Sequence, residues 1–290
     1  MNPVTNNAIE IRQLNKRFHD FSLKNVSFIL PRGYIMGFIG PNGAGKSTTI
    51  KLMMNLLRKD SGEIKILGLD HQRHEKDVKE QIGFVYDEGF FYEELTLGET
   101  ARMMSRFYRY WEDSTFADYL KKFQVNPSLK IKELSKGMKM KFSLAVALSH
   151  QAKLLIMDEP TSGLDPIVRS ELLEILSWLM QDEEKAIFFS THITSDLEKT
   201  ADYITMIHQG EIVFSQSKEA LFDEYHLVKG PKSLLTAPFT SHLAGIKENS
   251  FGFEGLYKGP EHSLLPREQI AVARPTLEEI MFYIIKEGKG

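Results

Sequence analysis

The pattern of apolar and polar positions changes along the chain, and each change predicts a different kind of structure. From Ile9 to Gly40, apolar positions alternate with polar ones and then form a continuous apolar run at 34–39, which is typical of strands, the last of them fully buried. In the second half, short apolar runs such as 154–157 and 186–189 alternate with helical periods such as 166–180. This alternation predicts a mostly parallel sheet with helices on both faces.

Between Glu99 and Phe123 the apolar positions follow a helical period and include many aromatic side chains. The aromatic residues are Phe107, Tyr108, Tyr110, Trp111, Phe116, Tyr119 and Phe123. We interpret this stripe as core packing, because aromatic side chains at helical spacing usually bury their large apolar surface.

Beyond about Phe222 the prolines become more frequent, and apolar periodicity is weak until Thr276. Thr276 and Glu279 then form a capping-box pattern that predicts a helix start. An apolar stripe follows at helical spacing: Leu277, Ile280, Met281, Ile284 and Ile285. We predict two domains, 1–221 and 222–290, the second a small accessory domain that ends in this amphipathic helix. The stripe needs cover, and we favour the same segment of a second copy, with the first domain or another partner as alternatives.

Composition narrows the classes of function. The chain has 36 basic and 39 acidic residues, which is not the electrostatic footprint of a dedicated nucleic-acid binder. Cysteine is absent, which excludes thiolate metal sites and cysteine nucleophiles. The apolar runs are far shorter than the ~20 residues of a spanning helix, and the start does not resemble a signal peptide. We therefore expect any membrane role to require docking to another protein.

A glycine-rich segment after the apolar run at 34–39 matches the pattern G-x-x-x-x-G-K-S. Its residues are Gly40, Pro41, Asn42, Gly43, Ala44, Gly45, Lys46 and Ser47, and Thr48 follows. The glycines allow backbone N–H groups to point at phosphate oxygens, and the next helix adds its positive N-terminus. Lys46 would reach the β- and γ-phosphates, and the Ser47 hydroxyl would bind Mg²⁺. The segment predicts nucleotide binding.

Two acidic residues, Asp158 and Glu159, follow the apolar run at 154–157. Ligands of parallel sheets bind at the carboxyl ends of the strands, so both side chains are placed for chemistry. Asp158 can hold the Mg²⁺ shell, and Glu159 can activate a water against the γ-phosphate.

These motifs, together with the segment Leu134–Met138 that precedes the acidic pair, resemble the ATP-binding subunit of an ABC transporter over roughly residues 8–220. The resemblance implies an α/β fold: a P-loop NTPase (RecA-like) core, an antiparallel β subdomain, a helical signature subdomain at about 89–145 and a small C-terminal appendage. It implies ATP hydrolysis with Mg²⁺ at the cytoplasmic face of the cell membrane. The implied partners are an integral-membrane permease and a second ATP-binding subunit, identical or homologous, and not nucleic acid.

The resemblance also assigns roles to single residues. Ser135 and Gly137 match the signature residues that clamp the γ-phosphate held by the other subunit. Phe18 matches the aromatic residue that stacks on adenine, and Asp165 matches the loop that couples the two sites. His192 matches the switch histidine, whose ring contacts the γ-phosphate and orients the water.

One departure from the family pattern follows the apolar segment 82–85. The family usually has a glutamine there, whereas this chain has an acidic pair of which Asp87 aligns best. A carboxylate can still bind Mg²⁺ or a water, so we expect Asp87 to belong to the metal shell. The next aromatic residues, Phe90, Phe91 and Tyr92, either dock the membrane partner or pack the helical subdomain onto the core.

At the subfamily level the chain resembles bacterial exporters of the bacitracin-resistance, acetoin-operon and phenol-soluble-modulin groups. We therefore expect an ATPase that powers a separate permease, which exports peptides or small amphipathic molecules. Two alternatives stay open at this point: a soluble ABC ATPase without a transport role, and a slow regulatory ATPase module.

Overall fold

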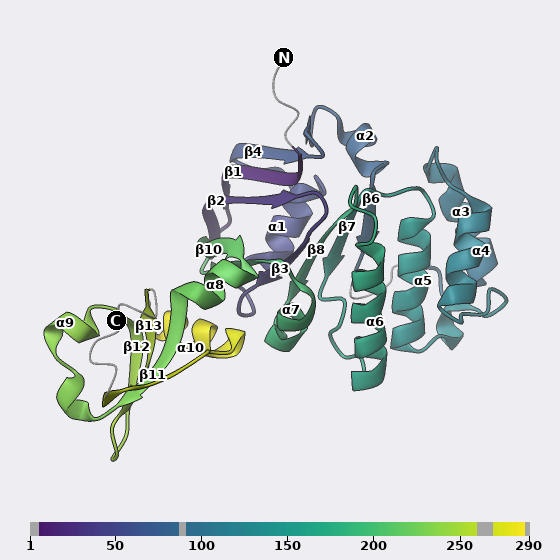
Figure 1. Cartoon of the computed structure of the whole chain (residues 1–290). Helices are drawn as coiled ribbons and strands as arrows, with labels where there is room; N and C mark the ends of the chain where they lie inside the picture. Colours follow the sequence, from purple (N-terminus) through teal and green to yellow (C-terminus); the bar gives the residue numbers. More distant parts are fainter. Residues whose placement is uncertain (1–5, 87–90, 260–268, 288–290) are drawn as a thin grey trace. The chain divides into compact units, whose positions relative to one another are not determined.

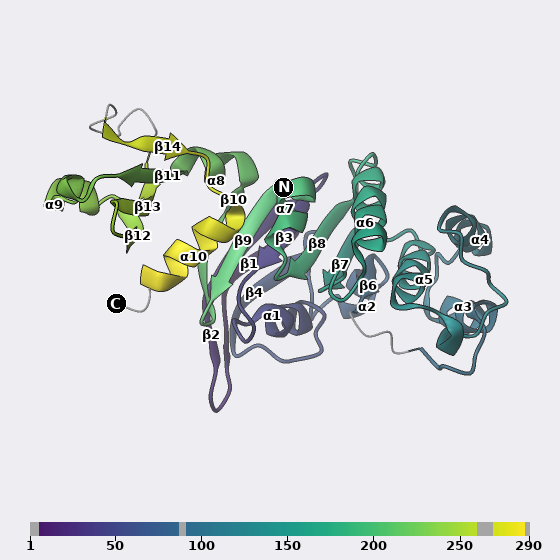
Figure 2. The same cartoon turned by 90° about the horizontal axis from the view of Figure 1, so that it is seen from below.

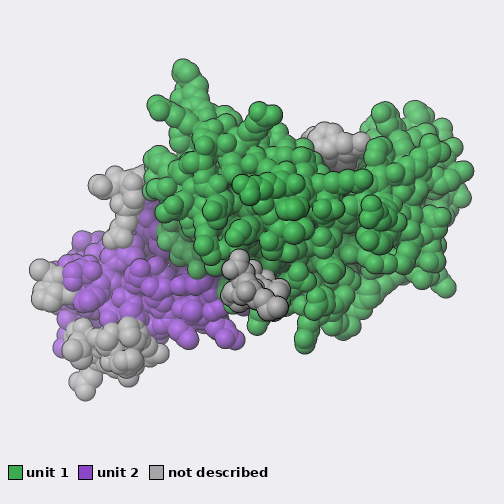
Figure 3. Space-filling view, turned by 90° about the horizontal axis from the view of Figure 1, so that it is seen from above, with its two compact units in different colours: residues 1–193, 200–215 green, residues 194–199, 216–290 purple. Residues whose placement is uncertain are grey.

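The computed structural model describes residues 6–86, 91–259 and 269–287, except for the side chains of 237, 238 and 287. The chain divides into two compact units, coloured separately in Figure 3. Unit 1 comprises 1–193 and 200–215, and unit 2 comprises 194–199 and 216–290. The sequence places the domain boundary at 222, a few residues later, and assigns 194–199 to the first domain.

Unit 1 is built on a six-stranded sheet with the order β10-β9-β3-β8-β7-β6 (Figure 1). All neighbouring pairs from β9 to β6 are parallel. The strands are β3 (Ile35–Ile39), β6 (Ile82–Val85), β7 (Leu154–Asp158), β8 (Ala186–Thr191), β9 (Tyr203–His208) and β10 (Glu211–Ser217). Figure 2 shows α1 (Lys46–Met53) on one side of this sheet and α6 (Pro166–Leu179) on the other. The predicted parallel sheet with helices on both faces is confirmed.

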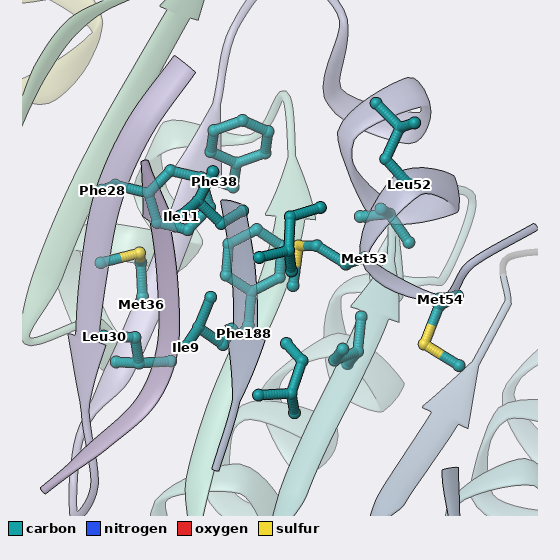
Figure 4. Close-up of a cluster of buried hydrophobic side chains, with 14 of the residues drawn as sticks. Ile9, Ile11, Phe28, Leu30, Met36, Phe38, Leu52, Met53, Met54 and Phe188 are labelled. Carbon is teal, nitrogen blue, oxygen red and sulfur yellow. The ribbon is translucent and has the colours of Figure 1, made fainter. Parts of the chain in front are cut away.

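A second, antiparallel sheet of unit 1 has the order β2-β1-β4-β5. Its strands are β1 (Asn7–Arg17), β2 (Ser22–Pro31), β4 (Ser61–Ile66) and β5 (Leu69–Asp70), and the short helix α2 (Glu75–Lys79) follows them. The apolar faces of the two sheets share one core with α1, part of which is drawn in Figure 4. Phe28 of β2 lies 5.5 Å from Phe38 of β3 and 5.7 Å from Phe188 of β8, measured between ring centroids. The predicted antiparallel β subdomain is thus present and is packed on the P-loop core.

The aromatic stripe and the segment after it form separate helices, of which Figure 1 shows the α-helices side by side. They are α3 (Leu97–Met104), η1 (Ser105–Phe107), α4 (Asp113–Lys122), η2 (Ile131–Glu133) and α5 (Lys136–Leu148). The prediction of continuous helix from 99 to 123 is wrong, because the backbone is extended at Tyr108 and again at Glu112, just before α4. Core packing of the stripe holds only in part: Phe116 and Phe123 are buried, whereas Phe107 and Tyr110 are exposed.

Unit 2 contains a four-stranded antiparallel sheet with the order β12-β13-β11-β14. The strands are β11 (Tyr225–Gly230), β12 (Leu243–Glu248), β13 (Phe253–Lys258) and β14 (Ala271–Ala273). The helices are α7 (Thr194–Thr200, all but its last residue in this unit), α8 (Lys218–Glu224), η3 (Lys232–Leu234), α9 (Ala237–Thr240) and α10 (Leu277–Glu287). The sequence did not predict this sheet, because its strands are short and β12 has a register shift where Gly245 has a φ of 141°.

The C-terminal helix α10 begins at the predicted capping box, where the Glu279 backbone N–H donates to Thr276 Oγ1 over 3.2 Å. Leu277 and Ile280 are fully buried, and so is Tyr283, which the predicted stripe did not include. Tyr283 lies against Gly245 of β12, and its hydroxyl donates to Glu254 of β13. Helix α10 therefore packs against β12 and β13 of its own unit, a cover that was not among those expected, and the rest of the stripe, Met281, Ile284 and Ile285, is half-buried.

We predict that the Tyr283–Glu254 hydrogen bond makes the stability of unit 2 depend on alkaline pH. Burial, with the adjacent Glu254 carboxylate as the next cause, raises the pKa of Tyr283. The folded unit thus holds this proton more tightly than the unfolded chain does. The stabilisation is complete below the ordinary tyrosine pKa of about 10 and is lost as the pH rises above it.

The test is urea denaturation of the wild type and of Tyr283→Phe at pH values of about 8 and about 10.5. At the lower pH the variant should be less stable by about 1.5 kcal/mol, because it lacks a hydrogen bond to a charged acceptor. Raising the pH should destabilise the wild type more than the variant. Tyr110→Phe, which alters an exposed tyrosine of unit 1, is the control. Equal pH dependence in all three proteins would contradict the prediction.

Candidate functional site

The glycine-rich segment Gly40–Ser47 connects β3 to α1, and its glycines are required by close backbone contacts. A Cβ atom on Gly40 would lie 2.2 Å from the carbonyl oxygen of Ile207 in β9. Gly45 has a φ of 116°, and a Cβ atom there would lie 2.6 Å from Leu23. The Gly210 backbone N–H donates to the carbonyl oxygen of Ala44 over 3.0 Å. The segment Gly40–Ser47 is thus held in a narrow curl, called the glycine curl below. Residues from the start and the end of unit 1 surround it.

Lys46, the first residue of α1, turns its buried ammonium group back into this curl. Its Nζ donates to the carbonyl oxygens of Gly40 at 2.8 Å and Pro41 at 3.4 Å. The same nitrogen lies 3.4 Å from Glu159 Oε1. The predicted phosphate-binding lysine and the predicted base are therefore in contact.

Asp158 and Glu159 stand at the carboxyl end of β7, and the neighbouring strand β8 fixes both. The hydroxyl of Ser190 donates to Asp158 Oδ1 over 2.5 Å, and the Glu159 backbone N–H donates to Ser190 Oγ over 3.0 Å. Glu159 has a φ of 50°, a left-handed conformation that is strained for a residue with a side chain. This conformation turns the carboxylate toward Lys46 instead of along the strand.

His192 follows the end of β8 and holds the other oxygen of Glu159. The Nδ1 atom of His192 lies 2.8 Å from Glu159 Oε2, and the backbone N–H of His192 donates to the same oxygen over 3.2 Å. One carboxylate thus bridges a lysine and a histidine. Because β3, β7 and β8 are parallel neighbours, their carboxyl ends bring Lys46, Glu159 and His192 to one edge of the sheet.

Two hollows with shared walls open at this edge. The larger, of about 700 Å³, is lined by Asp20, Phe21, Asn42, Gly43, Gly45, Lys46, Ser47, Thr48, Glu159, Ser162 and His192. The other, of about 530 Å³, is lined by Phe18, Pro41 and Ala44 together with residues 208 and 209, and it shares residues 20, 21, 42 and 43 with the first. The larger hollow has polar walls and suits phosphates. The smaller hollow, called the base hollow below, has aromatic walls and suits a planar base.

Phe21 is a wall residue that the sequence reasoning missed. It lines both hollows, and its ring would contact a Cβ atom placed on Gly45. Its centroid lies 6.4 Å from that of Phe18, with 29° between the two ring planes, so the two rings form one aromatic surface. No sequence pattern distinguishes Phe21 from a core phenylalanine, and only its position three residues after Phe18 could have suggested this role.

The signature residues lie elsewhere in unit 1. Ser135 caps the N-terminus of α5 by accepting the Met138 backbone N–H, and Gly137 lies so close to Val168 of α6 that a Cβ atom would come within 2.5 Å. Asp165 caps α6 in the same way, accepting from two backbone N–H groups. None of Ser135, Gly137 and Asp165 lines either hollow. Asp87 lies outside the described residues.

The aromatic segment after Asp87 separates into two environments. The ring of Phe91 packs edge-on against Phe142 of α5, with 4.9 Å between centroids. Tyr92 is exposed to 68% of its surface. Phe91 therefore packs the helical region, Tyr92 remains available to a partner, and Phe90 lies outside the described residues.

The donor groups at the sheet edge fit a Mg²⁺-nucleotide. Magnesium is usually bound by one or two carboxylates together with substrate phosphates and waters. Asp158 offers a carboxylate that Ser190 already orients, and Ser47 offers a hydroxyl beside the glycine curl. Among the described residues no cluster of three or more acidic or histidine side chains forms a separate metal cage. Tyr86, which directly follows β6, responds to the same acidic group. Burial is the main cause that raises the pKa of its hydroxyl, and the Asp158 charge is the second.

The fold and this edge define a P-loop NTPase, with a glycine curl, a buried lysine and an acidic strand end around one cavity. Comparison with known proteins identifies the family: the sequence pattern of the ABC transporter family matches residues 23–162, and the chain belongs to the ATP-binding subunits of ABC transporters. These are ATPases coupled to transport, and their ATP-binding domains bind ATP.

Two curated relatives and one solved structure illustrate the similarity. The chain is 32% identical over 216 residues to the bacitracin transport ATP-binding protein BcrA of Bacillus licheniformis, covering 74% of this chain and 69% of that protein. It is 35% identical over 224 residues to the lantibiotic transport ATP-binding protein SrtF of Streptococcus pyogenes, covering 74% and 96%. A solved ATP-binding subunit of an ABC transporter superposes with a TM-score of 0.67 at 29% identity, covering 74% of this chain and 91% of that one.

The comparison confirms the expected family and fold. It also supports a transport ATPase over the two alternatives without a permease. Within residues 6–86, 91–259 and 269–287, no helix is both long and apolar enough to cross a bilayer.

Proposed function

We propose that this chain hydrolyses ATP to drive a separate integral-membrane permease that exports peptides or small amphipathic molecules. ATP hydrolysis is supported by one observation: Glu159 contacts both Lys46 and His192 at the edge of the nucleotide cavity. The names of the relatives support a peptide-like cargo, since both bacitracin and lantibiotics are mentioned in them. In this proposal the chain lies at the cytoplasmic face of the cell membrane and is held there by the permease.

The residues of the site divide the work of hydrolysis. The backbone N–H groups of the glycine curl and the ammonium of Lys46 bind the β- and γ-phosphates. Glu159 accepts a proton from the attacking water. His192 holds that carboxylate and lines the same hollow, which supports the assignment of its ring to the γ-phosphate. Ser47 and Asp158 would hold Mg²⁺, which neutralises phosphate charge when bound. We propose Asp87 for the same shell because a carboxylate at its position in the sequence, just after β6, can bind Mg²⁺ or a water.

A second ATP-binding subunit completes the site. Ser135 and Gly137 lie at the N-terminus of α5, away from both hollows of their own chain. We assign them to the nucleotide of the other subunit, with Asp165 at the start of α6 in the loop that connects the two sites.

The permease is tested by purifying the tagged chain from its native membranes in detergent and identifying any integral-membrane protein that accompanies it. We expect one such protein, together with faster ATP hydrolysis by the complex than by the chain alone. The Lys46→Ala chain, purified in parallel, should retain the membrane protein but not the stimulation. Hydrolysis by the isolated chain at the same rate, with no membrane protein associated, would argue for a soluble ATPase.

Removing either aromatic wall of the base hollow should weaken nucleotide binding. A stacked aromatic pair is worth about 0.5–1.5 kcal/mol, so Phe18→Ala and Phe21→Ala should each raise the Kd for ATP by about 2- to 10-fold. Affinity for inorganic triphosphate, measured by the same calorimetric titration, should stay unchanged in Phe18→Ala. Phe107→Ala removes an exposed phenylalanine of the same unit and is the control. An ATP affinity that equals the wild-type value in both variants would exclude the aromatic surface from base binding.

A further inference from the structure

Unit 2 contains a hollow of its own, of about 500 Å³, at the end of its sheet where α8 packs against β11 and β14. Its walls combine two carboxylates, a guanidinium, an imidazole and apolar side chains. The volume lies within the range of small-molecule sites in proteins, about 300–1,000 Å³. Neither the ATPase chemistry nor the relatives assign any role to these residues.

The guanidinium of Arg274 is held in a defined orientation at this hollow. Its central carbon lies 4.2 Å from the centroid of the Phe222 ring, which is buried. A guanidinium stacked on a ring keeps its in-plane N–H donors available for a bidentate carboxylate. Within the described part of the chain, Arg274 forms no ion pair, although Glu219 and Asp223 line the same hollow.

His226 lines the same hollow as Arg274. Both residues adjoin the last pair of the antiparallel β11–β14 ladder, Leu227 with Ala273. His226 is only 9% exposed, and its Nε2 atom has no hydrogen-bond partner among the described residues. Because the surface of this atom is closed off, His226 shapes the wall beside Arg274 and leaves the hydrogen bonding of a ligand to the guanidinium.

Two acidic side chains of α8 also line the hollow. Glu219 and Asp223 are four residues apart on α8, a spacing that places them on one face of the helix, and both are exposed. They disfavour a simple anion near Arg274 and attract a positive group. Phe222 and Val272 add apolar surface between the charged groups.

We propose that this hollow binds a free α-amino acid with an apolar side chain. Arg274 binds its carboxylate, Glu219 and Asp223 bind its ammonium group, and the side chain lies against Phe222 and Val272. A zwitterion is the ligand class that satisfies both signs of charge at once. The accessory unit would then give the transport ATPase a small-molecule sensor that is separate from the nucleotide site.

The test is calorimetric titration of the full chain with L-leucine up to about 10 mM, which detects a Kd in the millimolar range or below. We expect saturable binding of leucine, and at least about tenfold weaker binding of leucine methyl ester and of N-acetylleucine, each of which lacks one charge. Valine, isoleucine, methionine and phenylalanine are titrated in the same way. If none of these amino acids binds saturably, or if either blocked derivative binds as well as leucine, the proposal is wrong.

Variants connect the binding to the named residues. Arg274→Gln should weaken leucine binding by about tenfold or more, and Arg274→Lys should not restore it, because lysine lacks the planar fork. Lys286→Gln is the matched control, since Lys286 also stacks on a ring of this unit, that of Phe282, but does not line the hollow. All variants should bind ATP with the wild-type Kd, which separates this proposal from the nucleotide site and verifies folding. Unchanged leucine affinity in Arg274→Gln would overturn the assignment.

Discussion

Glu159→Gln is expected to lower the rate of ATP hydrolysis by about 10²- to 10⁴-fold, the usual contribution of a positioned general base, while ATP still binds. The amide preserves the size of the side chain and its position next to Lys46 and His192, but it cannot accept the proton of the attacking water. The measurement is phosphate release at saturating ATP with Mg²⁺, together with a separate binding titration. Glu174→Gln, on the exposed side of α6, is the control and should hydrolyse normally.

Glu159→Gln also tests whether a second ATP-binding subunit completes the site. With hydrolysis blocked, ATP should hold two chains together, and light scattering should report a dimer with ATP and a monomer without nucleotide. Adding Ser135→Arg should prevent the dimer and leave ATP binding by each chain intact, because Ser135 does not line the cavity of its own chain.

Hydrolysis by Glu159→Gln within twofold of the wild type would show that another group activates the water.

Lys46→Ala is expected to weaken ATP binding itself, by about 10- to 150-fold. The substitution removes a charge-assisted contact to phosphate worth about 1.5–3 kcal/mol. It also removes the ammonium group from the Gly40 carbonyl oxygen and from Glu159 Oε1, while His192 still holds Oε2. The Glu159 charge, no longer offset by Lys46, adds repulsion toward phosphate, so the loss should lie toward the upper end of this range.

Calorimetric titration with ATP in the presence of Mg²⁺ measures this effect. Lys51→Ala removes an exposed lysine from the last turn of the same helix and should leave the affinity unchanged. Wild-type affinity in Lys46→Ala would rule out Lys46 as a phosphate ligand. Combining Lys46→Ala with Glu159→Gln should recover part of the lost binding, since the repelling charge is then absent.

The sequence predicts the centre of the site because its signals are local and the topology is regular. The glycine pattern fixes the curl around Lys46, and parallel strands always present their carboxyl ends at one edge, which brings Glu159 and His192 to it. Two features depended on contacts between distant segments and could not be predicted. These are the wall formed by Phe21 and the contact of Gly40 with Ile207, since neither Phe21 nor Ile207 belongs to a recognisable pattern.

The parts of the fold that were missed have different physical causes. The helical region was predicted as one helix because its apolar period continues through 105–112, although the backbone is extended at both Tyr108 and Glu112. In unit 2, the register shift in β12 at Gly245 interrupts the alternation that identifies a strand. The cover for α10 could not be predicted, because the sheet beneath it had not been recognised.

The contacts of the glycine curl with β9 and the turn after it bear on the order in which the protein becomes active during synthesis. Gly40 and Ala44 emerge from the ribosome early, but the Ile207 and Gly210 backbone groups that surround them come more than 160 residues later. A nascent chain that ends before β9 has the complete motif sequence but lacks the backbone groups that hold the glycine curl and one wall of the base hollow. The complete nucleotide site therefore forms only when almost all of unit 1 has been translated, so ATP cannot stabilise an earlier folding intermediate through that complete site.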